Sequence, residues 1–142
     1  KLDALDKGRV VTIFLGQILR GEDITIIGDG KQTRCFTYVD DAIKATFEAG
    51  IRPAAVGDIF NIGNSKETSM LELAECMIKA SPGKSKLKFV AMDAVYGKSY
   101  EDISRRVPDV SKMEKILGVK AQVPLEVGMK RTIDWFKASH VI

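Results

Sequence analysis

The stretch GDGKQTRCFTYVDD, Gly28 to Asp41, is the strongest indication of the fold in this 142-residue chain. Its first four residues predict a tight turn, because glycine adopts the positive φ angles that such turns need. A β-branched run at residues 24–27 precedes the turn, and residues 32–39 follow it as a second strand. We therefore predict a β-hairpin that leads into a helix.

Two aspartates end this stretch, directly before a helical pattern of apolar residues. At a helix start, one carboxylate can accept hydrogen bonds from unpaired backbone amides, and a second one favours the positive end of the helix dipole. Asp40 and Asp41 are therefore predicted to cap a helix. A metal ion would need further oxygen ligands nearby, so we predict no metal.

Arg34 is the residue of the stretch that best suits ligand binding. Strand alternation places it on one face with Gln32, Phe36 and Tyr38. An arginine held on a rigid strand among aromatic side chains can bind a phosphate or carboxylate through its fork of donors. Pairing with an acidic neighbour such as Asp40 explains the same residue equally well, and the local pattern leaves both interpretations open.

A second candidate for ligand binding is the stretch YGKSYEDISRRVPD, Tyr96 to Asp109. It combines two tyrosines with Lys98, Arg105 and Arg106 in a segment without clear periodicity. Cationic and aromatic side chains together suit a ligand that carries phosphates and a flat ring. A solvated charged loop is the alternative interpretation.

The remaining segments alternate between helical and strand patterns, and we interpret residues 1–142 as one domain. Helices are predicted at residues 10–19, 70–77 (behind a capping box of Ser69 and Glu72), 109–117 and 124–136, and strands at residues 58–62 and 87–90. The result is a mixed α/β (α+β) pattern. It lacks the long βαβαβ series of a complete doubly wound domain.

Composition narrows the classes of function. Apolar residues make up 45% and charged residues 29% of the chain, the mix of an ordinary globular protein. The 22 basic and 19 acidic residues are interspersed, which argues against nucleic-acid binding. The longest apolar run, residues 10–19, is too short and too polar for a membrane span. Cys35 and Cys76 fit buried thiols of a reducing cytoplasm, and the single histidine, His140, argues against a histidine-dependent nucleophile or a zinc site.

In combination, these stretches resemble the C-terminal part of the extended short-chain dehydrogenase/reductase family, the NAD-dependent nucleotide-sugar epimerases, dehydratases and decarboxylases. The motifs occur in family order along nearly the whole chain. They read ITIIGDGKQTRCFTYVDD (residues 24–41), FNIGN (60–64), RVPDVSKMEKILG (106–118) and EVGMKRTIDWF (126–136). The resemblance implies the C-terminal, substrate-binding part of a Rossmann-type enzyme whose N-terminal NAD-binding part is missing.

Within the family, YGKSYED ahead of Arg106 is similar to the UDP-glucuronate decarboxylases. These include the decarboxylase of the lipid A 4-amino-arabinose pathway and UDP-apiose/xylose synthase. The turn Gly28-Asp29-Gly30 departs from that subgroup, which leaves a UDP-sugar 4-epimerase or 4,6-dehydratase as an alternative. A non-catalytic interaction module of the same fold is a third interpretation.

The resemblance also implies roles for particular residues. Those expected to line a site for uridine and diphosphate are Thr25, Ile27, Lys31, Gln32 and Arg34, with Lys31 and Arg34 on phosphate. Tyr100 is expected to contact the nucleotide or sugar, and Arg106 the diphosphate and the sugar carboxylate. The matching arginine of the closest decarboxylases is implicated as a proton donor. Because the pKa of arginine is too high for an effective acid, we predict that Arg106 acts catalytically by stabilising the charge that develops as CO₂ leaves.

NAD is the cofactor that the resemblance implies for the full-length enzyme. In this family a Gly-rich loop of the N-terminal Rossmann part holds NAD, and the sequence contains neither that loop nor the catalytic Y-x-x-x-K. The chain is therefore expected to bind a UDP-sugar and to be inactive alone. Family members dimerise through helices of the missing part, which leaves a homodimer open.

Overall fold

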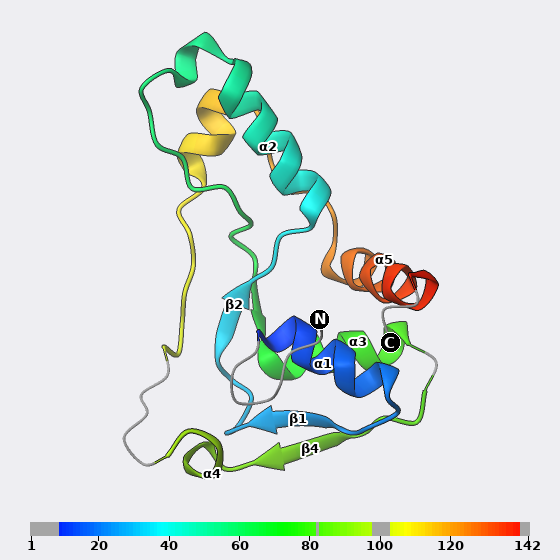
Figure 1. Cartoon of the computed structure of the whole chain (residues 1–142). Coiled ribbons are helices and arrows are strands. Elements are labelled where there is room, and N and C mark those ends of the chain that lie inside the picture. Colours follow the sequence, from blue (N-terminus) through cyan, green and yellow to red (C-terminus); the bar gives the residue numbers. More distant parts are fainter. Residues whose placement is uncertain (1–8, 82, 98–102, 140–142) are drawn as a thin grey trace.

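The computed structural model describes residues 9–81, 83–97 and 103–139 of the chain. Short strands and helices alternate along these residues (Figure 1). In chain order they are α1 (Val10–Leu19), β1 (Ile24–Ile27), β2 (Thr33–Cys35), α2 (Val39–Ile51), the 3₁₀ turn η1 (Pro53–Ala55), β3 (Glu67–Ser69), α3 (Met70–Ala80), β4 (Leu87–Val90), α4 (Met92–Tyr96), the π-helical turn η2 (Met113–Leu117) and α5 (Leu125–Ala138). The mixed α/β class predicted from the sequence is confirmed.

In the described part of the chain, the four strands form two separate pairs, so the predicted hairpin is wrong. β1 pairs in parallel with β4, and β2 pairs antiparallel with β3. The turn between β1 and β2 does form, but it directs the chain away from β1. Behind it, the carbonyl of Gly30 accepts a hydrogen bond from the Leu71 amide at 3.1 Å, and that of Gln32 accepts one from the Met70 amide at 3.0 Å. These bonds attach the chain after the turn to the start of α3.

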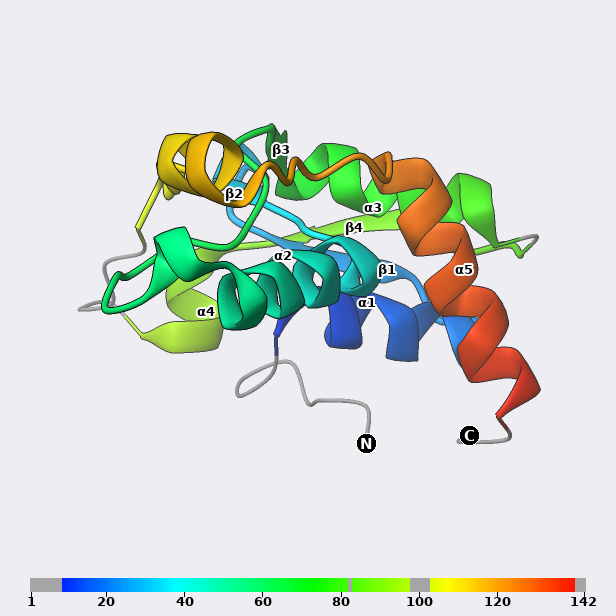
Figure 2. The ribbon, with the colours of Figure 1, turned by 90° about the horizontal axis from the view of Figure 1, so that it is seen from above.

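The main core lies between the β1–β4 pair and the helices α1, α3 and α5. Figures 1 and 2 show α1 and α3 beside each other over the strands, with α5 next to α3. Fully buried side chains from these elements meet in one cluster, which includes Leu15, Ile26, Leu73, Met77 and Ile133. The opposite face of the strands is open, since Phe89 of β4 is 56% exposed.

A second, smaller cluster holds α2, η1 and η2 together at the far end of the molecule (Figure 1). Its buried members include Ala45 of α2, Ala55 of η1 and Leu117 of η2. The strand predicted at residues 58–62 is wrong, because in the described part of the chain these residues pair with no strand. They run as an extended connection in which Ile59 is 85% exposed.

The aspartates of the opening stretch do not cap α2 as predicted. The residue before the helix is Tyr38, and its side chain makes no capping bond. Asp41 instead accepts hydrogen bonds from the backbone amides of Gln122 and Val123 at 3.0 and 2.9 Å. Asp40 lies 3.6 Å from the Arg131 guanidinium of α5. Both carboxylates still occupy the first turn, where the helix dipole favours them, but they tie α2 to the segment that enters α5.

Other local predictions are confirmed. Ser69 and Glu72 form the reciprocal capping box at the start of α3, and β4 lies where the strand was expected. The Asp109 carboxylate accepts a hydrogen bond from the Ser111 amide at 2.9 Å ahead of η2, and the chain leaves η2 at Gly118 with a φ of 65°. Pro124 precedes α5.

The short helix α4 precedes the second candidate stretch and ends at Tyr96, and no helix was predicted at residues 92–96. Tyr100 and His140 lie outside the described residues. Cys35 and Cys76 are both free thiols. Within the described ranges, no helix combines the length and the apolar character needed to cross a membrane.

Candidate anion-binding site on the β2–β3 sheet

A third segment extends the β2–β3 pair and brings the two predicted ligand-binding stretches together. Thr33 of β2 forms an isolated parallel bridge with Arg105, and its amide donates to the Ser104 carbonyl at 2.9 Å. The stretch that begins at residue 103 therefore runs alongside β2 (Figure 1). β2 is thus the middle strand, with β3 on its other side.

One face of this small sheet carries an ion-pair cluster centred on Glu67. Both oxygens of its carboxylate accept from the Arg105 guanidinium, with the shortest contact 2.7 Å to Nη2 and a second of 3.0 Å to Nε. The Thr33 hydroxyl donates to the same carboxylate at 2.8 Å. The bonds from Arg105, followed by the one from Thr33, hold the pKa of the Glu67 carboxyl below its ordinary value. Glu67 is therefore a charged acceptor shared by two neighbouring strands.

The opposite face carries Arg34 and Arg106. Arg34 directly follows Thr33, and Arg106 directly follows Arg105, the two residues that the bridge joins. The parallel register therefore makes the two arginines neighbours on adjacent segments, which lie about 4.8 Å apart in a sheet. Strand alternation turns both away from the face that Glu67 occupies. Arg34 Nη1 donates to the Thr33 carbonyl at 2.8 Å. This carbonyl and the Thr33 amide both face the segment that carries Arg106. The arrangement brings two guanidinium-bearing residues to one surface, which suits a multiply charged anion.

The turn before β2 places the predicted site residue Lys31 at the surface. Lys31 has a side chain that is 86% exposed, and its ammonium lies 3.2 Å from the Asp29 carboxylate. The Lys31 amide also donates to Asp29 at 3.0 Å, and these bonds lower the pKa of the Asp29 carboxyl. Lys31 is therefore exposed to solvent at the tip of the turn.

β1 carries two further predicted site residues, Thr25 and Ile27. Thr25 is buried, and its hydroxyl accepts a hydrogen bond from Gln17 of α1 at 2.9 Å. The Thr25 amide returns a bond to the Gln17 side-chain oxygen at 3.1 Å, so this pair belongs to the core. Ile27 is half-buried, and Gln32 Nε2 lies 3.5 Å from its carbonyl oxygen. The structure thus brings Arg34 and Arg106 together, while the Thr25 side chain lies apart from them in the core.

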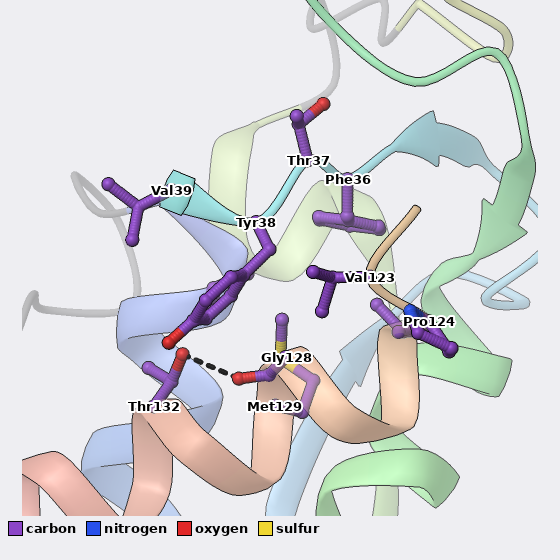
Figure 3. Close-up of a pocket in the computed structure, with 11 residues that line it drawn as sticks. Phe36, Thr37, Tyr38, Val39, Val123, Pro124, Gly128, Met129 and Thr132 are labelled. Carbon is purple, nitrogen blue, oxygen red and sulfur yellow. Dashed lines mark hydrogen bonds between the residues drawn. The ribbon is translucent and has the colours of Figure 1, made fainter. Parts of the chain in front are cut away.

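A separate apolar pocket of about 250 Å³ lies between the β2–α2 connection and α5. Figure 3 shows the Tyr38 ring over Gly128 and Thr132 of α5, with the Thr132 hydroxyl donating to the Gly128 carbonyl at 2.8 Å. Val123 and Pro124 form another wall. Of the predicted site residues that the structure describes, none lines this pocket. Strand alternation places Phe36 and Tyr38 on one face with Arg34, and it does not predict that, of these three, only the two aromatic residues line this pocket.

Glu67 and Thr33 are the site residues that sequence reasoning missed. Glu67 binds Arg105, which lies 38 positions later in the sequence. The residues next to Glu67 do not indicate such a distant partner. Strand alternation places Thr33 on the face away from Arg34, but it does not predict the acidic partner of Thr33 on β3.

Comparison with known proteins agrees with this architecture. The NAD dependent epimerase/dehydratase family model matches residues 3–63. The UDP-N-acetyl-alpha-D-glucosaminuronate decarboxylase of Bacillus cytotoxicus is 40% identical over 90% of this chain, which spans 40% of that protein. UDP-glucuronic acid decarboxylase 1 of Danio rerio is 33% identical over 93% of the chain, which spans 30% of it.

A solved structure shows the same fold. It is the UDP-glucuronic acid 4-epimerase of Bacillus cereus, in complex with UDP-glucuronic acid and NAD. The two chains superpose with a TM-score of 0.78 at 29% identity, over 92% of this chain and 40% of the epimerase. This chain therefore spans less than half the length of each of these proteins. In its motifs, in the match of residues 3–63 and in its fold, the chain is thus similar to the NAD-dependent epimerase/dehydratase family.

Proposed function

We propose that this chain is the UDP-sugar-binding, C-terminal part of an NAD-dependent enzyme, and that the enzyme is a UDP-glucuronate decarboxylase. The observation that supports this proposal is the neighbouring placement of Arg34 and Arg106 on one face of the β2–β3 sheet. Guanidinium groups bind diphosphate and carboxylate oxygens through paired donors. The names of the relatives and of the solved structure above all contain a UDP-linked sugar that carries a carboxylate.

In this proposal Arg34 binds the diphosphate, and Arg106 lies against the diphosphate and the sugar carboxylate. Arginine is in general too weak an acid to be an effective proton donor, so in this proposal Arg106 acts by stabilising negative charge as the carboxylate leaves as CO₂. Lys31 adds a weaker contact from the exposed turn. The contact of Tyr100 with the nucleotide or sugar is proposed from the sequence alone. A 4-epimerase or 4,6-dehydratase would use the same diphosphate contacts and is the second candidate, favoured by the similarity to the Bacillus cereus epimerase.

NAD is proposed as the cofactor of the full-length protein, and the described residues do not fit it by themselves. A dinucleotide site needs glycines at a strand-to-helix turn, where the helix N-terminus meets the diphosphate. At the two junctions where a strand leads directly into a helix, Ser69 precedes α3 and Ala91 precedes α4. The glycine turn after β1 leads to another strand instead. We therefore derive no hydride-transfer step from this chain.

Replacing Arg34 or Arg106 by alanine is expected to weaken the binding of UDP-glucuronate. Each change removes charge-assisted hydrogen bonds worth about 1.5–3 kcal/mol, which corresponds to roughly a 10- to 150-fold rise in Kd. Isothermal titration calorimetry with UDP and UDP-glucuronate measures the loss. Arg34→Ala should affect both ligands, whereas Arg106→Ala should affect UDP-glucuronate more strongly because it also loses the carboxylate.

Arg20→Ala is the matched control, since Arg20 pairs with Glu22 on the surface after α1. Circular dichroism checks that each variant keeps its helical content. The proposed function fails if the unchanged chain binds neither ligand, or if both alanine variants bind as tightly as Arg20→Ala.

The apolar stripe of α2 supports the view that further polypeptide completes this protein. Its residues follow one another at helical spacing and are 55–62% exposed; they are Val39, Ile43, Phe47 and Ile51. The adjoining Val56 and Ile59 are 84% and 85% exposed. A contiguous apolar surface of this kind marks a binding face. We propose that it packs against the NAD-binding part, because the relatives are more than twice as long as this chain.

The double variant Ile43→Glu, Phe47→Glu tests this face. With the stripe uncovered, the unchanged chain is expected to self-associate at micromolar concentration, and the double variant to elute as a monomer. Size-exclusion chromatography with light scattering measures the mass. Thr46→Glu adds a charge at another exposed position of α2 and should leave the association unchanged. A strictly monomeric unchanged chain would count against a binding role for the stripe.

A further inference from the structure

We propose that Glu67 is a positioning residue that holds Arg106 beside Arg34. It does so from the other face of the sheet, through its bonds to Arg105 and Thr33. This inference rests on the proposed anion-binding function of the two arginines, and it adds a residue to that site which touches no ligand itself.

The segment that carries Arg106 has little other attachment to β2. Among the described residues, its pairing with β2 consists of one isolated bridge and the bond from the Thr33 amide to the Ser104 carbonyl. A further contact between this segment and β2 would therefore help to keep the register in the unliganded chain.

Glu67 supplies that contact with a geometry that spans all three strands. It belongs to β3, and its side chain crosses the middle strand to reach the segment beyond. The two bonds of 2.7 and 3.0 Å from Arg105 Nη2 and Nε form a side-on fork, which fixes direction as well as distance. The 2.8 Å bond from Thr33 holds the carboxylate over the middle strand. One carboxylate thus joins the outer segment to β2 at the bridged residues.

The placement of Glu67 also keeps its negative charge away from the face that carries Arg34 and Arg106. Glu67 neutralises Arg105 on one face of the sheet, so it does not compete with an anion for the arginines on the other face. The Arg105 side chain is 68% exposed, and ion pairs of this exposure contribute little to overall stability. Loss of the pair should therefore change ligand binding much more than it changes the melting temperature.

Glu67→Gln and Arg105→Gln test the role of this pair. Both variants are expected to raise the Kd for UDP-glucuronate about tenfold in calorimetry, with a melting temperature close to that of the unchanged chain. The charge-exchanged variant Glu67→Arg, Arg105→Glu should recover most of the lost affinity, because the reversed pair can bridge the same strands. Glu48→Gln, which breaks the Glu48–Arg52 ion pair on α2, is the matched control and should bind normally.

Hydrogen exchange of the unliganded chain gives a second readout that does not depend on UDP-sugar binding. The Thr33 amide, which donates to the Ser104 carbonyl, is expected to exchange about tenfold faster in Glu67→Gln than in Glu48→Gln, because only the former loosens the bridge. Normal affinity and normal exchange in Glu67→Gln and Arg105→Gln would overturn the positioning role, even where Arg34→Ala and Arg106→Ala bind weakly. Weak binding by the pair variants without rescue on charge exchange would overturn it as well. If the two arginine variants bind normally, the proposed function itself fails.

Discussion

Gly30→Ala is expected to lower the free energy of unfolding by about 2–4 kcal/mol, a large share of the stability of a domain of this size. Gly30 has a φ of 71°, where an L-residue is strained by about 1–2 kcal/mol. A Cβ added here would also lie 2.9 Å from Cγ2 of Ile26 and 3.3 Å from Cβ of Leu71. Ile26 is fully buried in β1, so the core would have to move to accept the methyl group.

Gly21→Ala separates the strain from the packing. Gly21 has the same φ of 71°, but a methyl group added there would meet no heavy atom within 4 Å, so this variant should lose only the backbone contribution. Urea unfolding followed by circular dichroism measures both. Equal losses for the two variants would mean that the contact of Gly30 with the core is unimportant. Because Gly30 directs the chain toward α3, its variant should also bind UDP-glucuronate more weakly.

The second large effect that we expect is a complete lack of NAD-dependent turnover by this chain alone. Decarboxylation in the proposed enzyme needs hydride transfer to NAD, and the sequence contains neither the glycine loop nor the Y-x-x-x-K motif of the resemblance. We expect no release of CO₂ from UDP-glucuronate when the purified chain is incubated with NAD. The Danio rerio UDP-glucuronic acid decarboxylase 1 serves as the positive control under the same conditions.

A chimera makes this negative result informative. Replacing the matching segment of the Danio rerio protein by this chain should restore turnover, and Arg106→Ala within the chimera should abolish it again. Measurable CO₂ release by the isolated chain would contradict the proposal that catalysis requires a separate NAD-binding part. An active chimera that is indifferent to Arg106→Ala would contradict the proposed role of that arginine in charge stabilisation.

Features whose causes lie within a few residues could be predicted from the sequence. α1 and α5 follow apolar spacings, and the capping box of Ser69 and Glu72 joins residues three positions apart. β4 is a short strand that follows a polar segment, as expected. In each case backbone propensity and local hydrogen bonds agree with the burial that the fold later imposes.

Predictions that needed a partner elsewhere in the chain were wrong. The turn at Gly28–Lys31 resembles a hairpin turn, but β1 finds its partner in β4, and β2 finds its partner in β3. Asp41 has the residue type and position of a cap, but the amides of Gln122 and Val123 approach it from the connection to α5. Residues 58–62 have strand propensity, but no described strand lies beside them to complete a ladder.

The candidate site divides in the same way. Residue type and motif are local properties, so the sequence was enough to single out Arg34 and Arg106 as the residues suited to a charged ligand. Their placement as neighbours, the burial of Thr25 in the core and the link that Glu67 makes from behind the sheet all depend on the folded arrangement. The physical reason is that strand register depends on contacts between segments far apart in the chain, and alternation within one strand does not specify which segment will lie beside it.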